Sequence, residues 1–491
     1  MTRILQIGAG AAGLAAARAM LPTLAPHDEF VLADPSSPEQ GLAFGTAHPT
    51  HLLNLPADRM SLNPDDPFEF VRWRSRAYPL WRNAVAAAPE DCWSAFPPRQ
   101  LYGLYLTDVL RELTCQPAGP AHVELLPYTV TAIHPVGTRG TYVVGFSTGE
   151  LELFDRVIIS VGHQLNADPI PATCSLRRED VSTPYPPADL DPELCVGVLG
   201  TRLSGIDAVL ALAGNGHRGP IIMVSPSGRL PSVIGAAPVT GDADSVIAPL
   251  LAQPQLTADA IADHFRPQLA LPAGGPVVTD AGSFLRRELL FHDQGVPRRD
   301  QAVLSLTYPH ADELWQRLTV SERHRFHDRY HSRWMARLAA FPAVSARRLL
   351  ALIDSGQLQI SGQFDHVSRE SGGLRLQCRP ARSLPKIDHL IDARGPGYSE
   401  TSVRSHPLLA QLLDSGLACL DPLGGLRVVP DTFESVCPDE VVRQNLHLLG
   451  DITRGQFLTT TDVTRSVIYA RRLVAAVPSI DSVTTRGVDS L

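Results

Sequence analysis

The sequence predicts an α/β protein of two Rossmann-like, dinucleotide-binding domains, with the second domain inserted into the first. Residues 3–20 have the pattern of an apolar strand, a glycine-spaced turn and a helix. Residues 195–225 repeat the order strand, turn, helix and strand. Apolar segments ending in glycine at 155–163 and 389–397 lie on either side of the second unit. We expect both segments to be strands of the first domain, which the second unit therefore interrupts.

The first turn has glycines at Gly8, Gly10 and Gly13. In a nucleotide-binding turn of this spacing, the first glycine allows the tight bend, the second admits a pyrophosphate and the third lets the helix pack closely. The free N–H groups of the helix N-terminus attract the phosphates. The next predicted strand ends at Asp34, whose carboxylate can accept hydrogen bonds from an adenosine ribose. The alternative is a glycine-rich turn with a structural role only.

The second turn has Gly200, Ser204 and Gly205, but Arg202 stands where the central glycine is expected. A side chain at this position keeps the backbone from contacting a pyrophosphate closely. Arginine can instead donate two hydrogen bonds to a phosphate. Arg202 is therefore a candidate phosphate clamp, and the alternative is a vestigial turn that binds nothing.

The strand after this turn ends at Ser225, and Arg229 follows shortly after it. No acidic residue is present there to repel a 2′-phosphate, while a hydroxyl and an arginine favour one. The second unit is thus predicted to prefer NADPH to NADH.

A late apolar segment, NLHLLGD, ends in Gly450 and Asp451 and is followed by threonines, including Thr461, before a helical run. A carboxylate at a strand end beside a helix N-terminus could hold the ribityl chain and pyrophosphate of a flavin. The helix dipole would favour negative charge on a reduced flavin ring. Taken alone, a Gly-Asp pair is more typical of a simple turn.

The composition excludes several other classes of protein. A net charge of −8 does not suit nucleic-acid binding. No apolar run has the length of about 20 residues that a membrane span needs. The cysteines form no C-x-x-C pair and we identify no signal peptide, so a reducing cytoplasm is expected. His324, His327 and His331 have helical spacing, but we interpret them as a solvated face and predict no metal site.

The order of these motifs resembles the fold of glutathione reductase and of the class B flavin monooxygenases. Residues 41–73 more closely resemble an FAD/NAD(P)-binding protein family with a G-x-A-Y/F stretch, H-L-L-N-x-P and M-S. The matching residues are Gly41, Ala43, Phe44, His51, Leu52, Leu53, Asn54, Pro56, Met60 and Ser61. That family is similar to N-hydroxylating flavin monooxygenases, including enzymes that oxidise L-aspartate to nitrosuccinate.

The resemblance implies FAD, NADPH, dioxygen and a small amine or amino-acid substrate that reacts with a C4a-hydroperoxyflavin. It makes His51, Asn54 and Met60 candidate flavin-lining residues. The alternatives are a polar loop histidine, a loop-capping asparagine and a core methionine. The family's R-H-R-like run is missing at 335–342. If that run binds an acidic substrate in relatives, a different substrate is expected here.

We predict an FAD-binding domain at 1–190 and 350–491. An NADPH-binding domain with a helical elaboration is predicted at 191–349, and helices from 60–115 are expected over the flavin. The rival functions are an NADPH-dependent flavin reductase or oxidase and a non-catalytic nucleotide-binding sensor. The sequence assigns no catalytic residue and leaves the substrate open. It also leaves the oligomeric state open, with a homodimer among the expectations.

Overall fold

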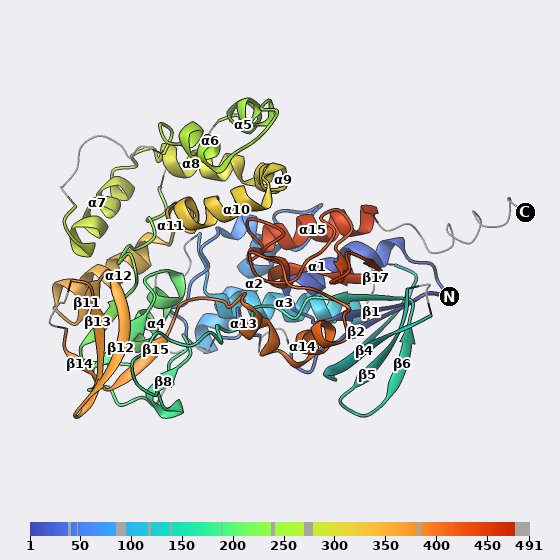
Figure 1. Ribbon diagram of the computed structural model, residues 1–491, viewed down its shortest axis with the longest axis horizontal. Coiled ribbons are helices and arrows are strands. Elements are labelled where there is room, and N and C mark those ends of the chain that lie inside the picture. Colours follow the sequence, from blue (N-terminus) through green and yellow to red (C-terminus); the bar gives the residue numbers. More distant parts are fainter. Residues whose placement is uncertain are drawn as a thin grey trace, which may run out of the picture.

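The computed structural model shows two sheets side by side with a layer of helices over them (Figure 1). Within the described part of the chain, no helix is long and apolar enough to cross a bilayer. The structure describes residues 1–37, 41–46, 48–84, 95–115, 119–137, 140–187, 189–236, 241–269, 278–380 and 384–476.

The first sheet has six strands in the order β16-β17-β7-β1-β2-β3. All neighbouring pairs are parallel except β16 with β17. The central strand β1 is almost completely buried, as expected for a parallel strand covered on both faces. The strands span Arg3–Ile7 (β1), Glu29–Ala33 (β2), His122–Leu126 (β3), Arg156–Ile159 (β7), Glu434–Val436 (β16) and Val442–Leu448 (β17).

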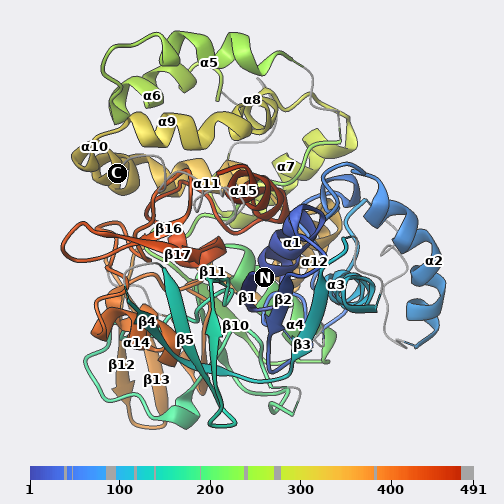
Figure 2. The ribbon, with the colours of Figure 1, turned by 90° about the vertical axis from the view of Figure 1, so that its right-hand side faces the viewer.

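Helices and a small antiparallel sheet, β4-β5-β6, pack around this first sheet (Figure 2). Helix α1 packs against α15 and α3, and α14 packs against β4. The side chain of Gln411 exchanges hydrogen bonds of 3.0 and 3.1 Å with the backbone of Ile133 across that last contact. Residues 85–94 of the predicted helical range 60–115 lie outside the described part. The elements span Ala11–Met20 (α1), Glu69–Ala84 (α2), Arg99–Cys115 (α3), Glu400–Arg404 (α13), Pro407–Asp414 (α14), Val463–Ala476 (α15), Val130–Val136 (β4), Thr141–Phe146 (β5) and Leu151–Phe154 (β6).

The second sheet has five parallel strands in the order β11-β10-β9-β15-β8. The antiparallel strands β12, β13 and β14 share a hydrophobic core with one side of it. Helices α4, α7 and α12 share a second core with it. The elements span Val181–Ser182 (β8), Val196–Leu199 (β9), Ile221–Val224 (β10), Leu358–Ser361 (β11), Phe364–Glu370 (β12), Gly373–Cys378 (β13), Lys386–Ile387 (β14), His389–Asp392 (β15), Leu203–Gly214 (α4), Ala281–Asp293 (α7) and Ala343–Asp354 (α12).

This sheet composition corrects the predicted boundaries at residues 190 and 350. Strand β8 comes before residue 190, and β11 and β15 come after residue 350, yet all three belong to the second sheet. The segment at 389–397 was expected in the first domain, but its strand β15 pairs with β9. The misassignment arises because buried parallel strands have the same apolar pattern in either sheet. The assignment of FAD to one unit and NADPH to the other stays a prediction.

The helical layer has its own core, which is closed by a residue from the C-terminal segment. Phe265, Trp315 and Phe326 lie in this core together with Leu458. The helical elaboration predicted within 191–349 contacts both units, because α7 packs against α12 of the second unit while Trp315 donates a 3.1 Å hydrogen bond to the backbone carbonyl of Gly455 in the first. The remaining helices span Ala243–Leu251 (α5), Ala258–Phe265 (α6), Arg299–Thr307 (α8), Ala311–Arg317 (α9), Val320–Phe326 (α10) and Ser332–Leu338 (α11).

Candidate functional site

A cavity of about 850 Å³ lies between the two units. Gly8, Asp34, Ser160 and Gly450 line it, and each follows the carboxyl end of a strand in the first sheet. The second unit contributes Arg202 from its own turn. Ligands of open α/β sheets bind at this end of the strands.

The first turn contains two glycines that the protein itself requires and one that leaves open space. Gly8 has φ of +91°, and a Cβ atom there would lie 2.3 Å from the carbonyl oxygen of Ser160. A Cβ atom on Gly13 would lie 1.9 Å from the carbonyl oxygen of Gly8. A Cβ atom on Gly10 would meet nothing within 4 Å. The space above Gly10, at the start of α1, therefore fits a phosphate group.

Asp34 is oriented by its own surroundings. Its Oδ2 accepts a hydrogen bond of 2.7 Å from the Ala9 amide, and Oδ1 accepts bonds of 2.9 and 3.0 Å from the Ser36 amide and hydroxyl. A carboxylate has about four acceptor directions, so about one remains on Oδ2. That arrangement fits a ribose hydroxyl and, with the first turn, a dinucleotide.

The second turn repeats the steric requirements of the first. Gly200 has φ of +118°, and a Cβ atom there would lie 2.2 Å from the carbonyl oxygen of Ala393. A Cβ atom on Gly205 would lie 2.2 Å from the carbonyl oxygen of Gly200. At the middle position Arg202 has φ of −97°, in the same extended region as Gly10 with −74°. Arginine therefore fits this position without backbone strain.

The side chain of Arg202 turns toward the helical layer. Its Nη2 donates to the backbone carbonyl of Ser332 and, at 2.9 Å, to the Ser332 hydroxyl. Burial and the nearby Arg229 lower the pKa of Arg202. Arg202 and Ser204 line the cavity beside the N-terminus of α4, a position where both could contact a phosphate.

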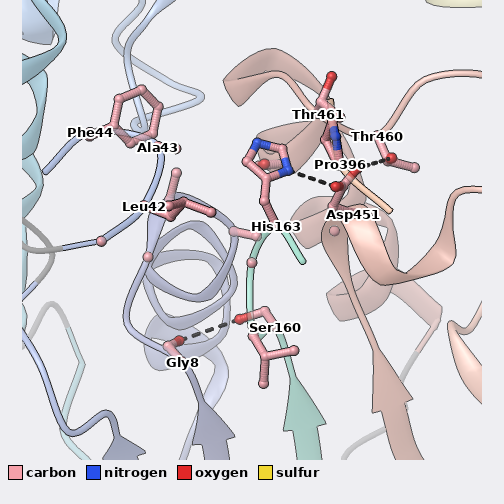
Figure 3. Close-up of a pocket in the computed structure, with 18 of the residues that line it drawn as sticks. Gly8, Leu42, Ala43, Phe44, Ser160, His163, Pro396, Asp451, Thr460 and Thr461 are labelled. Carbon is pink, nitrogen blue, oxygen red and sulfur yellow. Dashed lines mark hydrogen bonds and ion pairs between the residues drawn. The ribbon is translucent and has the colours of Figure 1, made fainter. Parts of the chain in front are cut away.

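Asp451, which follows β17 of the first unit and lines the cavity, is the centre of a hydrogen-bonded cluster. His163 Nδ1 lies 2.6 Å from Oδ2 of Asp451, and the Thr460 hydroxyl donates to Oδ1 at 3.0 Å (Figure 3). The Tyr398 hydroxyl donates to the same carboxylate at 3.1 Å. Burial alone would raise the pKa of Asp451, but the ion pair with His163 lowers it. Burial alone would likewise lower the pKa of His163, and Asp451 raises it.

Arg454 connects this cluster to the helical layer. Its Nη1 donates to the Tyr398 hydroxyl at 3.1 Å, and the guanidinium lies 4.8 Å above the centre of the Tyr398 ring. Its Nη2 lies 3.0 Å from Nε2 of His331. Burial, followed by the charge of Arg454, lowers the pKa of His331 to about 3. His331 is therefore a neutral hydrogen-bond acceptor for Arg454.

The position of His331 corrects the predicted solvated histidine face. His331 lines the cavity, at the end of a π-helical turn spanning His327–His331 (η7). Helical spacing shows which side chains share a face, but not what covers that face. The described residues contain no group of three or more side chains that could hold a metal ion.

Most of the predicted binding residues line the cavity. Those that do are Gly8, Gly10, Asp34, Asn54, Met60, Arg202, Ser204, Gly450, Asp451 and Thr461. Gly13, Gly200 and Gly205 lie behind the turns, where they allow close packing.

His51 is the clearest error among the predicted residues, because it does not line the cavity. It is fully buried, with Nδ1 2.7 Å from the Thr46 hydroxyl and Nε2 3.0 Å from the backbone carbonyl of Asp207 in α4. Burial lowers its pKa to about 4. His51 thus joins the first unit to the second, and both ring nitrogens are occupied by protein partners.

Ser225 and Arg229 also lie outside the cavity lining. The Ser225 hydroxyl is 2.9 Å from that of Thr201 and accepts a 2.9 Å bond from the Gly228 amide. Arg229 is exposed. Their role with a 2′-phosphate stays a prediction.

Several polar residues of the cavity could not be predicted from sequence patterns. Each is a single residue without a diagnostic spacing, although His163 directly follows a predicted strand ending in glycine. These residues are Arg99, His163, Arg394, Tyr398, His406 and Arg454.

Comparison with known proteins agrees with the dinucleotide-binding geometry. Residues 6–164 match the model of the FAD-NAD(P)-binding family. A search of curated proteins found no match to the chain.

Solved structures share the fold over almost the whole chain. Ornithine N-hydroxylase from Kutzneria sp. 744, solved with reduced FAD, NADP⁺ and L-ornithine, is 17% identical with a TM-score of 0.58, covering 98% of this chain and 99% of that chain. L-lysine 6-monooxygenase from Pseudomonas syringae is 16% identical with a TM-score of 0.57, covering 96% and 98%. Bacillithiol disulfide reductase from Staphylococcus aureus is 11% identical with a TM-score of 0.54, covering 99% of both chains. At such identities the likeness establishes the two-unit fold, and that fold is shared by enzymes of different chemistry.

Proposed function

We propose that the protein is an FAD- and NADPH-dependent monooxygenase that N-hydroxylates the amine of a small substrate. One observation carries the proposal: a single cavity is lined by both nucleotide turns, through Gly10 from the first unit and Arg202 from the second. Two dinucleotides bound at these turns would have their reactive rings within this one cavity. Shared folds with ornithine and lysine hydroxylases support this choice of reaction.

The first unit holds FAD in this proposal. The N-terminus of α1 and the space above Gly10 receive the pyrophosphate, and Asp34 receives the adenosine ribose. Asp451 and the N-terminus of α15 take the flavin end, where a helix dipole favours negative charge. Asn54 and Met60, from the stretch 41–73, line the same cavity.

The second unit holds NADPH, with Arg202 and Ser204 at its phosphates. When bound, the cofactors supply hydride transfer and the activation of dioxygen. The chain's own residues bind and orient the reactants and exclude water from the cavity. The ion pair of His163 and Asp451 keeps a proton-bearing ring on the cavity wall.

A plain NADPH-dependent reductase or oxidase is the second candidate, because a disulfide reductase shares the fold. The cavity lining within the described residues contains no cysteine, so this chain offers no thiol there for disulfide exchange. Oxygen transfer to an amine is thus preferred to disulfide chemistry.

The purified flavoprotein tests the proposal directly. NADPH is added without oxygen, and bleaching of the flavin is followed by absorbance. Oxygen is then admitted with and without amines and amino acids, while hydroxylamine products and hydrogen peroxide are measured. We expect flavin reduction by NADPH and a hydroxylated product with one substrate class. Peroxide release with every compound identifies an oxidase, and failure of NADPH to reduce the flavin supports a non-catalytic nucleotide-binding protein.

A further inference from the structure

Arg454 is a cavity-lining arginine with no carboxylate within ion-pair distance among the described residues, although its charge acts on Asp451. Its polar contacts are the Tyr398 hydroxyl and His331 Nε2, which are both neutral. It makes no ion pair with any residue that the structure describes. Two other arginines of the cavity differ, since Arg99 lies 2.7 Å from Asp207 and Arg394 lies 2.7 Å from Asp392.

The hydrogen-bonding capacity of Arg454 is only partly used. A guanidinium has five N–H donors, and Tyr398 and His331 accept one each, which leaves three. Stacking on the Tyr398 ring fixes the plane of the fork. A fixed guanidinium with free donors matches the geometry of a carboxylate, which can accept two parallel hydrogen bonds.

The charges around Arg454 also favour an anion. The nearest carboxylate in its cluster, that of Asp451, is already engaged by His163, Thr460 and Tyr398. Arg202 approaches the same helical segment from the second unit, at Ser332, and makes no ion pair within the described residues either. Two cations, Arg454 and the protonated His163, therefore act on the single carboxylate of Asp451. A bound anion would balance this excess of positive charge.

We infer that Arg454 binds a carboxylate of the substrate, which is therefore an amino acid rather than a simple amine. The inference rests on the proposed function, and it names the substrate class for that cavity. The two cofactor pyrophosphates have other places, at the N-termini of α1 and α4. Arg454 follows β17 of the first unit, and its side-chain hydrogen bonds go to Tyr398 and His331 rather than to a residue of either turn.

Matched ligand pairs test the inference by binding rather than turnover. Isothermal titration calorimetry is carried out on the enzyme loaded with FAD and NADP⁺. The pairs are L-lysine with cadaverine, L-ornithine with putrescine, and L-aspartate with L-asparaginamide. Each pair differs in its carboxylate groups, while an amine is kept. We expect the amino acid of at least one pair to bind about 10- to 100-fold more tightly than its partner, as a charged hydrogen bond implies.

Three variants assign the preference to Arg454. Arg454→Gln should remove most of that 10- to 100-fold preference, while leaving binding of the carboxylate-free partner within about 3-fold. Arg454→Lys keeps the charge and should retain part of the preference. Tyr398→Phe removes a neutral acceptor and should retain nearly all of it. If Arg454→Gln fails to hold FAD, the Arg454→Lys result carries the test.

Several results would overturn the inference. One is equal weakening of both members of a pair in Arg454→Gln, which indicates a structural role. Another is a loss of NADP⁺ binding instead, which places the arginine at a cofactor phosphate. Absence of binding by every amino acid tested also rejects it. If the carboxylate preference is found but no hydroxylated product forms, the proposed function fails while the carboxylate site stands.

Discussion

The two glycine turns of this protein differ at one position and agree at the others. Gly8 and Gly200 have positive φ, and a Cβ atom at either position would clash with a backbone carbonyl oxygen. At the middle position, a Cβ atom on Gly10 would meet nothing within 4 Å, whereas Arg202 has a charged side chain that lines the cavity. The fold thus requires glycine at the bend of each turn. The residue at the middle position is not restricted by packing, so the ligand that binds there can determine it.

This comparison separates two kinds of evidence within one motif. Where a Cβ atom would clash, glycine is required by the packing of the chain itself. Where a Cβ atom would meet open space, glycine instead indicates that a ligand approaches the backbone. Arg202 shows that the second turn keeps its backbone shape without that middle glycine. The two turns are therefore expected to hold phosphates by different means, through backbone N–H groups in the first and through a guanidinium in the second.

The largest expected effect comes from the enforced position. Gly8→Ala should lower the free energy of unfolding of the FAD-free protein by about 2–5 kcal/mol, through strain at positive φ and overpacking against Ser160. Gly10→Ala should change it by less than about 0.5 kcal/mol and instead weaken FAD binding. Urea unfolding and FAD retention measure both effects. Equal destabilisation by the two variants would contradict the distinction.

The second effect concerns the charged position. Arg202→Gly restores the glycine motif but removes the proposed charged phosphate contact, so we expect the NADPH Michaelis constant to rise about 10-fold or more. Arg202→Lys should give an intermediate value, and FAD content should not change in either variant. A lower Michaelis constant in Arg202→Gly would mean that backbone approach matters more than the guanidinium.

The third effect tests the ion pair of His163 and Asp451 on the cavity wall. The raised pKa of His163 means that its stabilisation is fully present below about pH 6.5 and is lost as pH rises through the raised pKa. The lowered pKa of Asp451 means that its stabilisation is lost only as pH falls through that value. His163→Gln should therefore cost about 1.5 kcal/mol near pH 6, and less at alkaline pH. Urea unfolding across pH measures this, with the exposed His134→Gln as control.

That pH profile has a clear contrary outcome. If the difference between wild type and His163→Gln grows as pH rises above neutrality, His163 is not the charged partner of Asp451.

The smallest expected effect is on cofactor preference and concerns Arg229 of the second unit. Arg229 is exposed, so its contact with a 2′-phosphate would be screened by water. Arg229→Gln should reduce the preference for NADPH over NADH about 2- to 5-fold, as measured by the ratio of kcat/KM values. Arg266→Gln, an exposed arginine of the helical layer, should leave the ratio unchanged. An unchanged ratio in Arg229→Gln as well would remove Arg229 from the nucleotide site.

Local patterns in the sequence predicted the two βαβ units correctly. A buried strand, a glycine turn and a helix occupy neighbouring positions in the chain, so their interactions leave a readable spacing. Strand β15 was placed in the wrong sheet because its apolar pattern says nothing about its neighbours, β8 and β9. Its partners are decided by long-range packing.

The same reason explains which site residues were missed. Asp34 and Gly10 belong to a motif, and both line the cavity. Arg454 and His331 meet across 123 residues of sequence, so no spacing indicates their contact. His51 belongs to a recognisable stretch, but its ring turns toward the backbone of α4, which the stretch itself does not contain.

The buried pairing of the helical layer with the C-terminal segment has a consequence for how the chain is made. Arg465 is fully buried and donates to Asp312 at 3.1 Å, 153 residues earlier in the sequence. Leu458 completes the same core. On the ribosome, the layer therefore emerges long before the residues that seal it. Its apolar surface stays exposed until the C-terminal segment is synthesised. We therefore expect this layer to be the part of the nascent chain most in need of a chaperone.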